Sequence, residues 1–400
     1  MQIVYVDSAI ALNAAVTNMA AESTYLAIDT EFRREDTYFP ELCLIQVATS
    51  DTVFLIDALE VKDLTPFFDI LKKTTMLKVF HSGRQDLEIF CHLMQGEITA
   101  PIFDTQIAAM LAGYGESAGF ETLVSKLLSV SLDKTSRHTD WTQRPLTEEQ
   151  KTYAINDVLY LRPLYELMVK KLTAKGRLDW MRSEVRLLET SDFLITVPSE
   201  AWRRLSLRNP SARYLAIVRK LAEWREETAQ KTNIPRAWLL KDEVILDIAS
   251  RKISLMDGLF KIPNFPSNDE LIANDVFNIV QTVLNQPVDE LPLLEVLPSL
   301  NKSQQNILEM LKLLLKITAE KLEVSPRLIA EKEDLIKWLT TAEIQEEKDT
   351  ANWRDEAFWK KAKELLDGRL VLRVHNGRIK FEPVEDKSSC SPSSINQPVT

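Results

Sequence analysis

The sequence predicts an α/β fold in the first half of the chain and all-helical structure after it. Up to about residue 195, short apolar segments rich in β-forming residues are mixed with helical patterns. After Val197-Pro198 the strand signal almost disappears. Strands first and helices later, around one mixed sheet, are typical of an α/β domain. Because 400 residues exceed the usual size of a single hydrophobic core, we expect two or three domains.

Residues 1–195 carry five strand signals and five helical patterns. The predicted strands cover residues 3–6, 25–30, 42–48, 53–56 and 77–80. The third and fourth flank Thr49-Ser-Asp51, a turn-like sequence that predicts a hairpin. The predicted helices cover residues 63–72, 84–94, 104–111, 121–128 and 147–172. The last begins with Thr147-Glu-Glu-Gln150, which resembles a capping box.

Two helical domains are expected next, over residues 206–287 and 292–374. The first opens at Asn209-Pro210-Ser211, and prolines at positions 287 and 292 mark the linker between the domains. Residues 383–400 have the composition of a disordered tail.

The two helical domains look like copies of each other. Thr228-Ala229-Gln-Lys231 recurs ninety residues later as Thr318-Ala319-Glu-Lys321. Pro235-Arg236 recurs ninety-one residues later as Pro326-Arg327. The change of offset predicts one inserted residue in the second copy.

Composition places the chain among soluble globular proteins, with 45% hydrophobic and 27% charged residues. No apolar run approaches the roughly 20 residues of a spanning helix, and the N-terminus lacks a signal-peptide pattern. We therefore expect a cytoplasmic protein without a membrane partner. We also expect a monomer. Cys43, Cys91 and Cys390 are odd in number and widely scattered, which argues against a disulfide framework and a cysteine-rich zinc site.

The charge of the chain is unevenly distributed. A net charge of -10 would ordinarily argue against a nucleic-acid partner, because phosphate binding depends on Lys and Arg. Residues 201–261, however, contain thirteen Lys and Arg against seven Asp and Glu, a local excess of six positive charges. Residues 291–375 contain fourteen against fifteen. A nucleic-acid surface is therefore expected on the first helical domain.

Four carboxylates stand where predicted elements can direct them into one cleft. Asp29 and Glu31 lie two residues apart at the end of a predicted strand, so their side chains leave the same face. Asp86 lies in the first turn of a predicted helix, and Asp157 follows Tyr153 by four residues, one turn along another helix. Hard cations such as Mg²⁺ and Mn²⁺ prefer oxygen ligands, and four acids suit two such ions, a pair used in phosphoryl transfer.

Each of these signals has an ordinary structural alternative. Acids such as Asp29 and Glu31 often end strands, and Asp86 could simply complement the helix dipole. A Tyr and an Asp four residues apart are more often a helix-surface pair than part of an active site. The individual pairs therefore do not decide the function.

The surrounding sequence resembles the ribonuclease D family of 3′-to-5′ exonucleases, whose class is named for four acids and a tyrosine. Three motifs carry the resemblance: residues 27–48, which include Asp29-Thr-Glu31; Phe80-His81-Ser-Gly83-Arg-Gln-Asp86-Leu87; and Asp140-Trp141-Thr-Gln143-Arg144-Pro145-Leu146 leading into Gln150, Tyr153, Asp157, Tyr160 and Leu161. The resemblance implies a ribonuclease H-like mixed-sheet exonuclease domain over residues 1–195.

The resemblance also implies roles for single residues. Asp29, Glu31, Asp86 and Asp157 would bind two divalent metal ions, Mg²⁺ or Mn²⁺, and Tyr153 would position the attacking water. These five residues are the predicted catalytic site. His81 has either a structural role or a substrate contact. Arg33, Arg34 and Gln46 could each reach a nucleotide. The alternative for the two arginines is a solvated loop charge, and the alternative for Gln46 is a buried polar contact on its strand.

The helical regions resemble a tandem pair of HRDC domains. In the first, Leu221-Ala-Glu-Trp224-Arg225 and Leu246-Asp-Ile248-Ala249 fit the pattern, although Ile253 stands where proline is common. The second has Leu314-Leu315 in place of the Trp-Arg pair. Trp and Met on these helices are expected in the core rather than stacked on bases. Two modules favour a bacterial enzyme over its eukaryotic relatives.

The sequence thus predicts a metal-dependent 3′-to-5′ exoribonuclease that hydrolyses RNA 3′ ends, with tRNA precursors as the substrates that the family implies. One alternative is a DNA-directed exonuclease, which the tandem HRDC pattern and the lack of a polymerase region disfavour. Another is a non-catalytic RNA-binding scaffold, which the presence of all five motif residues disfavours.

Overall fold

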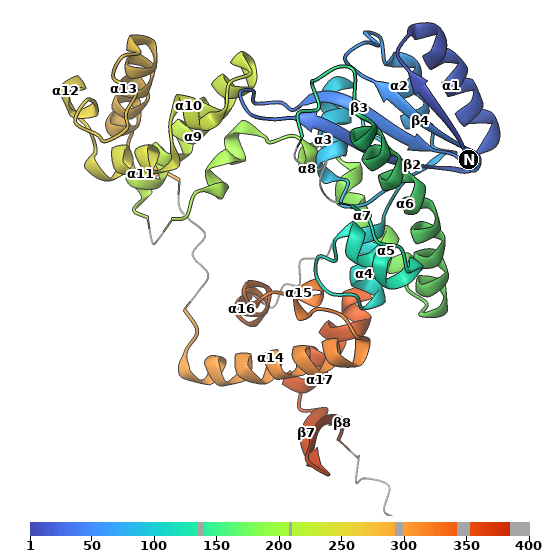
Figure 1. Cartoon of the computed structure of the whole chain (residues 1–400). Coiled ribbons are helices and arrows are strands. Elements are labelled where there is room, and N and C mark those ends of the chain that lie inside the picture. The colour runs from blue at the N-terminus through green and yellow to red at the C-terminus, as the bar shows by residue number, and fades with distance from the viewer. Residues whose placement is uncertain (134–138, 208–209, 293–298, 342–352, 385–400) are drawn as a thin grey trace, which may run out of the picture. The chain divides into compact units, whose positions relative to one another are not determined.

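The computed structural model describes residues 1–133, 139–207, 210–292, 299–341 and 353–384 (Figure 1). The expected tail beyond residue 384 lies outside these ranges. The chain divides into two compact units, one of residues 1–112 and 117–296 and one of residues 113–116 and 297–400. Within the described ranges, no helix combines the length and apolarity needed to cross a membrane.

A mixed six-stranded sheet forms the centre of residues 1–195 of the first unit. Its strands are β1 (Gln2–Val6), β2 (Tyr25–Arg33), β3 (Glu41–Ala48), β4 (Thr52–Asp57), β5 (Leu77–Phe80) and β6 (Ile102–Asp104), in the spatial order β1-β4-β3-β2-β5-β6. Strand β3 is antiparallel to both of its neighbours, whereas the other pairs are parallel. The predicted hairpin between β3 and β4 is confirmed.

Strand β6 and helix α1 are among the elements of this part that were not predicted. Strand β6 has only three residues, too few for an alternating pattern to stand out. Helix α1 (Ala9–Glu22) is rich in alanine, so its apolar and polar faces differ little in sequence. Its start is nevertheless fixed by Ser8, whose side chain accepts a hydrogen bond from the backbone of Ala11.

Helices cover both faces of the sheet (Figure 1). On one face, α1, α2 (Thr65–Leu71) and α3 (Arg84–Leu93) share a buried core with the β2 residues Leu26 and Ile28. Side chains alternate along a strand, so Asp29 and Glu31 point to the other face. There the long helix α6 (Glu148–Ala174) packs against β2, β3, β4 and β5. The sheet therefore presents the acids of β2 to the helix that carries Tyr153 and Asp157.

The start of α6 is fixed by the predicted capping box, which is confirmed. The Thr147 side chain accepts a hydrogen bond from the Gln150 backbone, and the Gln150 side chain accepts one from the Thr147 backbone. Around α6 the chain forms further short helices: α4 (Thr105–Ala112), α5 (Phe120–Leu128), α7 (Leu178–Val185), η1 (Arg186–Glu189) and α8 (Ser191–Leu194).

The rest of the first unit is helical, as predicted. Its elements are η2 (Pro198–Arg204), α9 (Ala212–Thr232), α10 (Arg236–Leu239), α11 (Asp242–Arg251), α12 (Met256–Leu259), α13 (Glu270–Asn285) and η3 (Val288–Glu290). Apolar residues of η2, α9, α11 and α13 form its own core, separate from the core beneath the sheet. Most aromatic residues lie within or against a core, but Trp238 is 62% exposed, so the expectation of a core position is wrong for this residue.

The second unit begins with three helices that match those of the first. They are α14 (Lys302–Leu322), α15 (Pro326–Ile329) and α16 (Lys332–Thr341), followed by η4 (Asp355–Trp359), α17 (Lys360–Leu366), β7 (Leu370–His375) and β8 (Arg378–Pro383). Each of α14, α15 and α16 starts ninety residues after α9, α10 and α11, respectively. The predicted insertion is therefore wrong: the proline stands at the helix cap in the first copy and inside the helix in the second.

The end of the second unit corrects another expectation. Residues 292–374 were expected to be helical throughout, yet β7 and β8 form an antiparallel hairpin over residues 370–383. Asn376 and Gly377 connect the strands with φ angles of 50° and 71°. An Asn-Gly pair between alternating apolar and polar residues favours this turn, so the signal was present in the sequence.

Candidate active site

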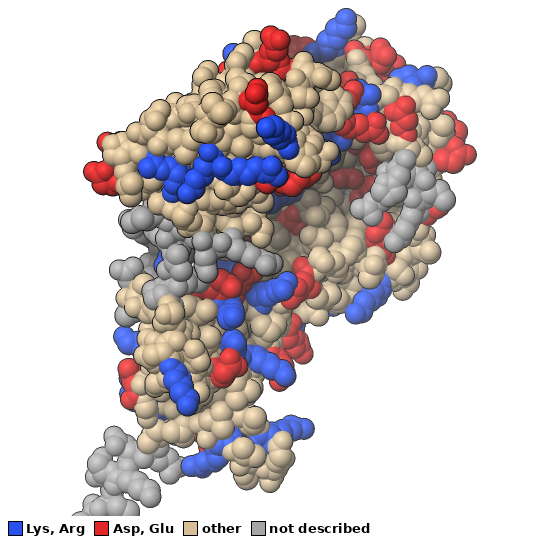
Figure 2. Space-filling view, turned by 90° about the vertical axis from the view of Figure 1, so that its left-hand side faces the viewer, with Lys and Arg blue, Asp and Glu red and all other residues tan. Residues whose placement is uncertain are grey.

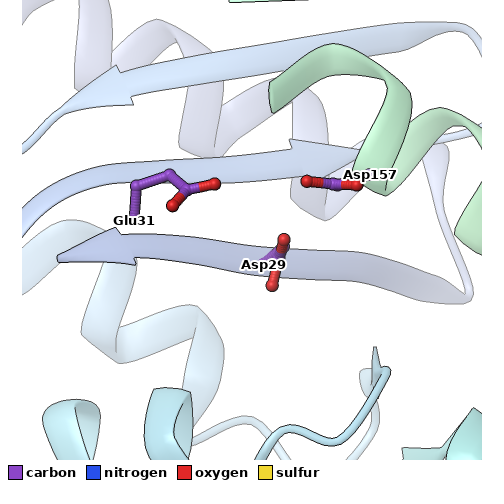
Figure 3. A group of neighbouring side chains, drawn as sticks. All are labelled: Asp29, Glu31 and Asp157. Carbon is purple, nitrogen blue, oxygen red and sulfur yellow. The ribbon is translucent and has the colours of Figure 1, made fainter. Parts of the chain in front are cut away.

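Three of the predicted carboxylates converge in the structure. Asp29 and Glu31 come from β2 and Asp157 from α6, and one oxygen of each lies within 4.8 Å of the others. Figure 3 shows the three carboxyl groups directed toward a common space, with Asp157 projecting from the green helix. Residues 126 positions apart in the sequence are thus brought together by the packing of α6 on the sheet.

Asp86 reaches the same cavity from the other side of β2. It lies in the first turn of α3, is only 6% exposed, and accepts a hydrogen bond from the Thr30 hydroxyl. Thr30 stands between Asp29 and Glu31 and points to the opposite face of the strand. Asp86 is outside the group of three converging carboxylates but lines the same cavity. Thr30 was not among the predicted site residues, although its place within Asp-Thr-Glu indicated it.

The surroundings of these acids disfavour their ionised forms. Burial raises the pKa of Asp29 well above its ordinary value, and the neighbouring charges of Asp86, Asp157 and Glu31 raise it further. Burial also raises the pKa of Asp86 to about 6, although the hydrogen bond from Thr30 opposes the change. A set of oxygen donors whose charges repel one another fits hard divalent cations, which would neutralise that repulsion.

The acids line a cavity of about 910 Å³. Tyr153 and Trp141 also line it, and their ring centroids are 6.1 Å apart. The predicted site residues Asp29, Glu31, Asp86, Tyr153 and Asp157 thus all face one cavity. Several further lining residues were not predicted: Gln85, Gln106, Phe120, Glu121 and Thr139. Phe120 and Glu121 begin α5, and nothing in their local sequence indicated the cavity.

The structure places the nearby polar residues whose roles were left open. Gln46 is fully buried opposite Asp29 on β3, and neither of its amide atoms has a hydrogen-bond partner among the described residues. The buried alternative is therefore the correct one for Gln46. Arg33 and Arg34 do line the cavity, but they are paired, Arg33 with Glu41 at 2.9 Å and Arg34 with Glu88 at 3.2 Å.

His81 both lines the cavity and packs into the protein. Its Nδ1 lies 2.9 Å from the hydroxyl oxygen of Thr105, and its ring packs against Phe120. Burial lowers the pKa of His81 below its ordinary value, although Asp104 and Glu121 oppose the change. The lowered pKa favours the neutral imidazole, which adds no positive charge to the acidic cavity.

The remaining surface carries both signs of charge. On the face drawn in Figure 2, lysine and arginine side chains are interspersed with acidic ones. Cys43 and Cys91 are buried free thiols.

Comparisons with known proteins agree with this geometry. Residues 3–173 match the family model of a 3′-5′ exonuclease, and residues 215–269 match that of an HRDC domain. The chain is 38% identical to ribonuclease D of Bartonella henselae, over 89% of this chain and 88% of the relative. It is also 38% identical to ribonuclease D of a Jannaschia species, over 93% of this chain and 97% of the relative.

A solved structure supports the same assignment over most of the chain. The crystal structure of Escherichia coli ribonuclease D superposes with a TM-score of 0.79 at 29% identity, covering 92% of this chain and 99% of that one. The fold, the cavity with its acids and the sequence identity over nearly the full length agree. The chain belongs to the ribonuclease D family of 3′-to-5′ exonucleases.

Proposed function

We propose that this protein trims RNA from the 3′ end by hydrolysis, one nucleotide at a time, and releases nucleoside 5′-monophosphates. The observation that carries the proposal is the convergence of Asp29, Glu31 and Asp157 within 4.8 Å, with Asp86 in the same cavity. Oxygen donors from three separate segments line this one cavity. This is the arrangement that phosphodiester hydrolysis assisted by divalent cations requires.

Asp29, Glu31, Asp86 and Asp157 would hold two divalent cations, Mg²⁺ or Mn²⁺. When bound, such ions activate water and stabilise the leaving oxygen of an in-line displacement. The protein contributes fixed positions for the four acids: β2 orients two of them, the Thr30 hydroxyl orients Asp86, and the helix α6 orients Asp157. The cavity also excludes bulk water from Asp86, whose side chain is almost fully buried.

Tyr153 would hydrogen-bond the attacking water and direct it toward the scissile phosphorus. A phenol has a pKa of roughly 10, which makes it a poor general base at neutral pH but a good hydrogen-bond partner. Tyr153 lies one helical turn before Asp157 and packs near Trp141, so its ring is held at the wall of the cavity.

RNA with structured 3′ ends, including tRNA precursors, is the substrate class we propose. The E. coli relative is described as an exoribonuclease involved in structured RNA processing. Residues 201–261 carry an excess of six positive charges and overlap the HRDC match, so this region is suited to the RNA body. We divide the chain into an exonuclease domain of residues 1–195 and HRDC domains of residues 206–287 and 292–374. The equal spacing of α9–α11 and α14–α16 supports the second HRDC assignment.

A trimming assay tests the proposal. The protein is incubated with a 3′-extended tRNA or with a single-stranded DNA of matched sequence, in Mg²⁺, Mn²⁺ or EDTA, and the products are resolved by length. We expect stepwise shortening of the RNA that EDTA and Asp29→Asn abolish. Asp51→Asn serves as the matched control. Asp51 is an exposed residue between β3 and β4, so this variant should retain activity. Shortening of DNA alone would indicate a DNA-directed enzyme, and RNA binding without shortening would indicate a scaffold.

A further inference from the structure

Arg144 makes an unusually complete set of hydrogen bonds beside the active site. Its Nη2 donates to the Asp57 carboxylate at 2.7 Å and to the Cys43 carbonyl at 2.9 Å. Its Nη1 donates to the carbonyls of Trp141 and Gln143 at 2.8 and 2.9 Å, and its Nε donates to the second oxygen of Asp57. All five N–H groups of the guanidinium are therefore used.

Asp57 is correspondingly saturated. It ends β4, is 1% exposed, and accepts hydrogen bonds from the backbone of Leu59 and Glu60 and from the Tyr5 hydroxyl as well as from Arg144. Burial alone would raise the pKa of Asp57, but the hydrogen bonds from Arg144 and Tyr5 outweigh burial and lower it. Asp57 is thus an ionised, rigid acceptor fixed to the sheet.

The hydrogen bonds of Arg144 join two parts of the active site. The Asp57 and Cys43 acceptors belong to β4 and β3, whereas the Trp141 and Gln143 carbonyls belong to the segment of residues 139–146. This segment lines the cavity with Thr139, Asp140 and Trp141 and leads directly into α6. Arg144 does not line the cavity, so it is not placed to contact substrate.

We propose that Arg144 and Asp57 are positioning residues that hold segment 139–146 and the start of α6 against the sheet, and thereby set Tyr153 and Asp157 opposite Asp29 and Glu31. A planar guanidinium that bonds a carboxylate at two points and three carbonyls at once specifies orientation as well as distance. Gln150 continues the connection, because its side chain donates to Thr139 and to the Asp140 carbonyl from within the first turn of α6.

The inference rests on the proposed function and is tested by Arg144→Lys, which keeps the charge but cannot reproduce the five bonds. Because misplacement by about 1 Å can cost on the order of a hundredfold in rate, we expect kcat on an RNA oligonucleotide to fall roughly tenfold to a hundredfold. KM should change much less, because no substrate contact is removed. Titration with Mn²⁺, followed by electron paramagnetic resonance without substrate, should show weakened binding.

Asp57→Asn should reproduce both defects, and the double variant should be no worse than the more severe single variant, since the two residues act as a unit. Arg177→Lys is the matched control: Arg177 is also buried and donates to a backbone carbonyl, that of Leu111, outside segment 139–146. Assays are run well below the melting temperature of each variant. If Arg144→Lys is too unstable to purify, Asp57→Asn and the milder Tyr5→Phe supply the same comparison.

Two outcomes are distinguishable. A wild-type protein that does not shorten RNA would contradict the proposed function itself. An active wild type in which Arg144→Lys and Asp57→Asn lose no more kcat and Mn²⁺ affinity than Arg177→Lys would overturn the positioning role alone.

Discussion

At the scale of single residues, the active site consists of acids held where ionisation is costly. Asp29 is surrounded by Asp86, Asp157 and Glu31, and Asp86 is almost completely buried. Carboxylates placed this way destabilise the metal-free fold when they are ionised, because burial and neighbouring like charge both favour the protonated form. The arrangement suits a cation site, in which bound cations neutralise the acids. Without cations, the repulsion between the acids lowers the stability of the folded state.

Asp86→Asn should therefore stabilise the metal-free protein. Burial raises the pKa of Asp86 to about 6, so between roughly pH 4 and pH 6 the folded state binds more protons than the unfolded state, and stability decreases as pH rises through this window. In EDTA at pH 8, the variant should melt a few degrees above wild type, as followed by circular dichroism. The difference should shrink toward pH 4.

Saturating Mg²⁺ provides the control for this prediction. Because the cation binds the folded wild type, it should raise the wild-type melting temperature and raise that of Asp86→Asn much less. A variant that melts below wild type in EDTA at pH 8 would show that Asp86 has a stabilising partner that outweighs its burial.

Tyr153→Phe separates orientation of water from binding. The phenylalanine keeps the ring beside Trp141 but removes the hydroxyl. We expect turnover of RNA to fall by about a hundredfold or more, because general positioning and proton-transfer groups contribute on that order, while Mn²⁺ and RNA affinities stay close to wild type. Single-turnover kinetics and equilibrium binding measure the two effects. Equal losses of turnover and of binding would contradict the water-positioning role.

At the scale of elements, α6 is the part of the fold that completes the site. Its 27 residues pack against four strands, β2, β3, β4 and β5, and its first turn is fixed by reciprocal hydrogen bonds between Thr147 and Gln150. The position of Tyr153 and Asp157 depends on where this helix starts, since both lie within its first three turns. A defect in the cap should consequently affect stability first and the site second.

Thr147→Ala should lower the free energy of unfolding by about 1 kcal/mol, the usual cost of losing an N-cap side chain. Thr152→Ala is the matched control on the same helix. Thr152 is exposed, and its hydroxyl donates a hydrogen bond to the Glu148 carbonyl within the helix. Urea unfolding of both variants measures the difference. Similar losses for the two threonines would mean that the cap contributes nothing beyond a surface hydroxyl.

At the scale of the whole molecule, the exonuclease part of the first unit contacts its helical part through a buried charged group. Glu226 of α9 is fully buried and accepts hydrogen bonds from Arg236 and from the Tyr38 hydroxyl of the β2–β3 connection. Arg236 also donates to that hydroxyl at 2.8 Å, and the Phe39 backbone donates to Asn233 at 2.9 Å. The connection that carries Tyr38 begins beside the cavity, at Arg33 and Arg34.

Arg236→Ala should destabilise the first unit strongly, by about 3–5 kcal/mol, because it leaves the Glu226 carboxylate buried without its cation. Burial would raise the pKa of Glu226, but the bonds from Arg236 and Tyr38 outweigh burial and lower it. The contribution of the pair is therefore complete above the ordinary pKa of glutamate and is lost as pH falls through the lowered value.

Arg251→Ala is the control, because Arg251 pairs with Asp247 on the surface of α11 and should cost at most about 1 kcal/mol. Urea unfolding at pH 7 and at roughly pH 4 measures both variants. If Arg236→Ala and Arg251→Ala lower the free energy of unfolding equally at pH 7, the buried pair stabilises the protein no more than the surface pair does.

Much of the fold could be predicted because its signals are local. Five strands, the hairpin between β3 and β4, the capping box of α6 and the helical character after residue 197 all depend on neighbouring residues in the sequence. The failures have equally local causes. Strand β6 is too short, α1 has little polar contrast, and the hairpin of β7 and β8 was overlooked despite its Asn-Gly turn.

The sequence by itself determined the family and the five residues that face the cavity, because three motifs resemble those of the ribonuclease D family well beyond their acids. Only the tertiary structure decided how these residues meet: Asp86 is held by Thr30 outside the three converging carboxylates, and Gln46 is fully buried. It also revealed that Arg144 joins segment 139–146 to Asp57. The physical reason is that these contacts join groups far apart in the chain, and such distances are set by packing across the sheet rather than by periodicity.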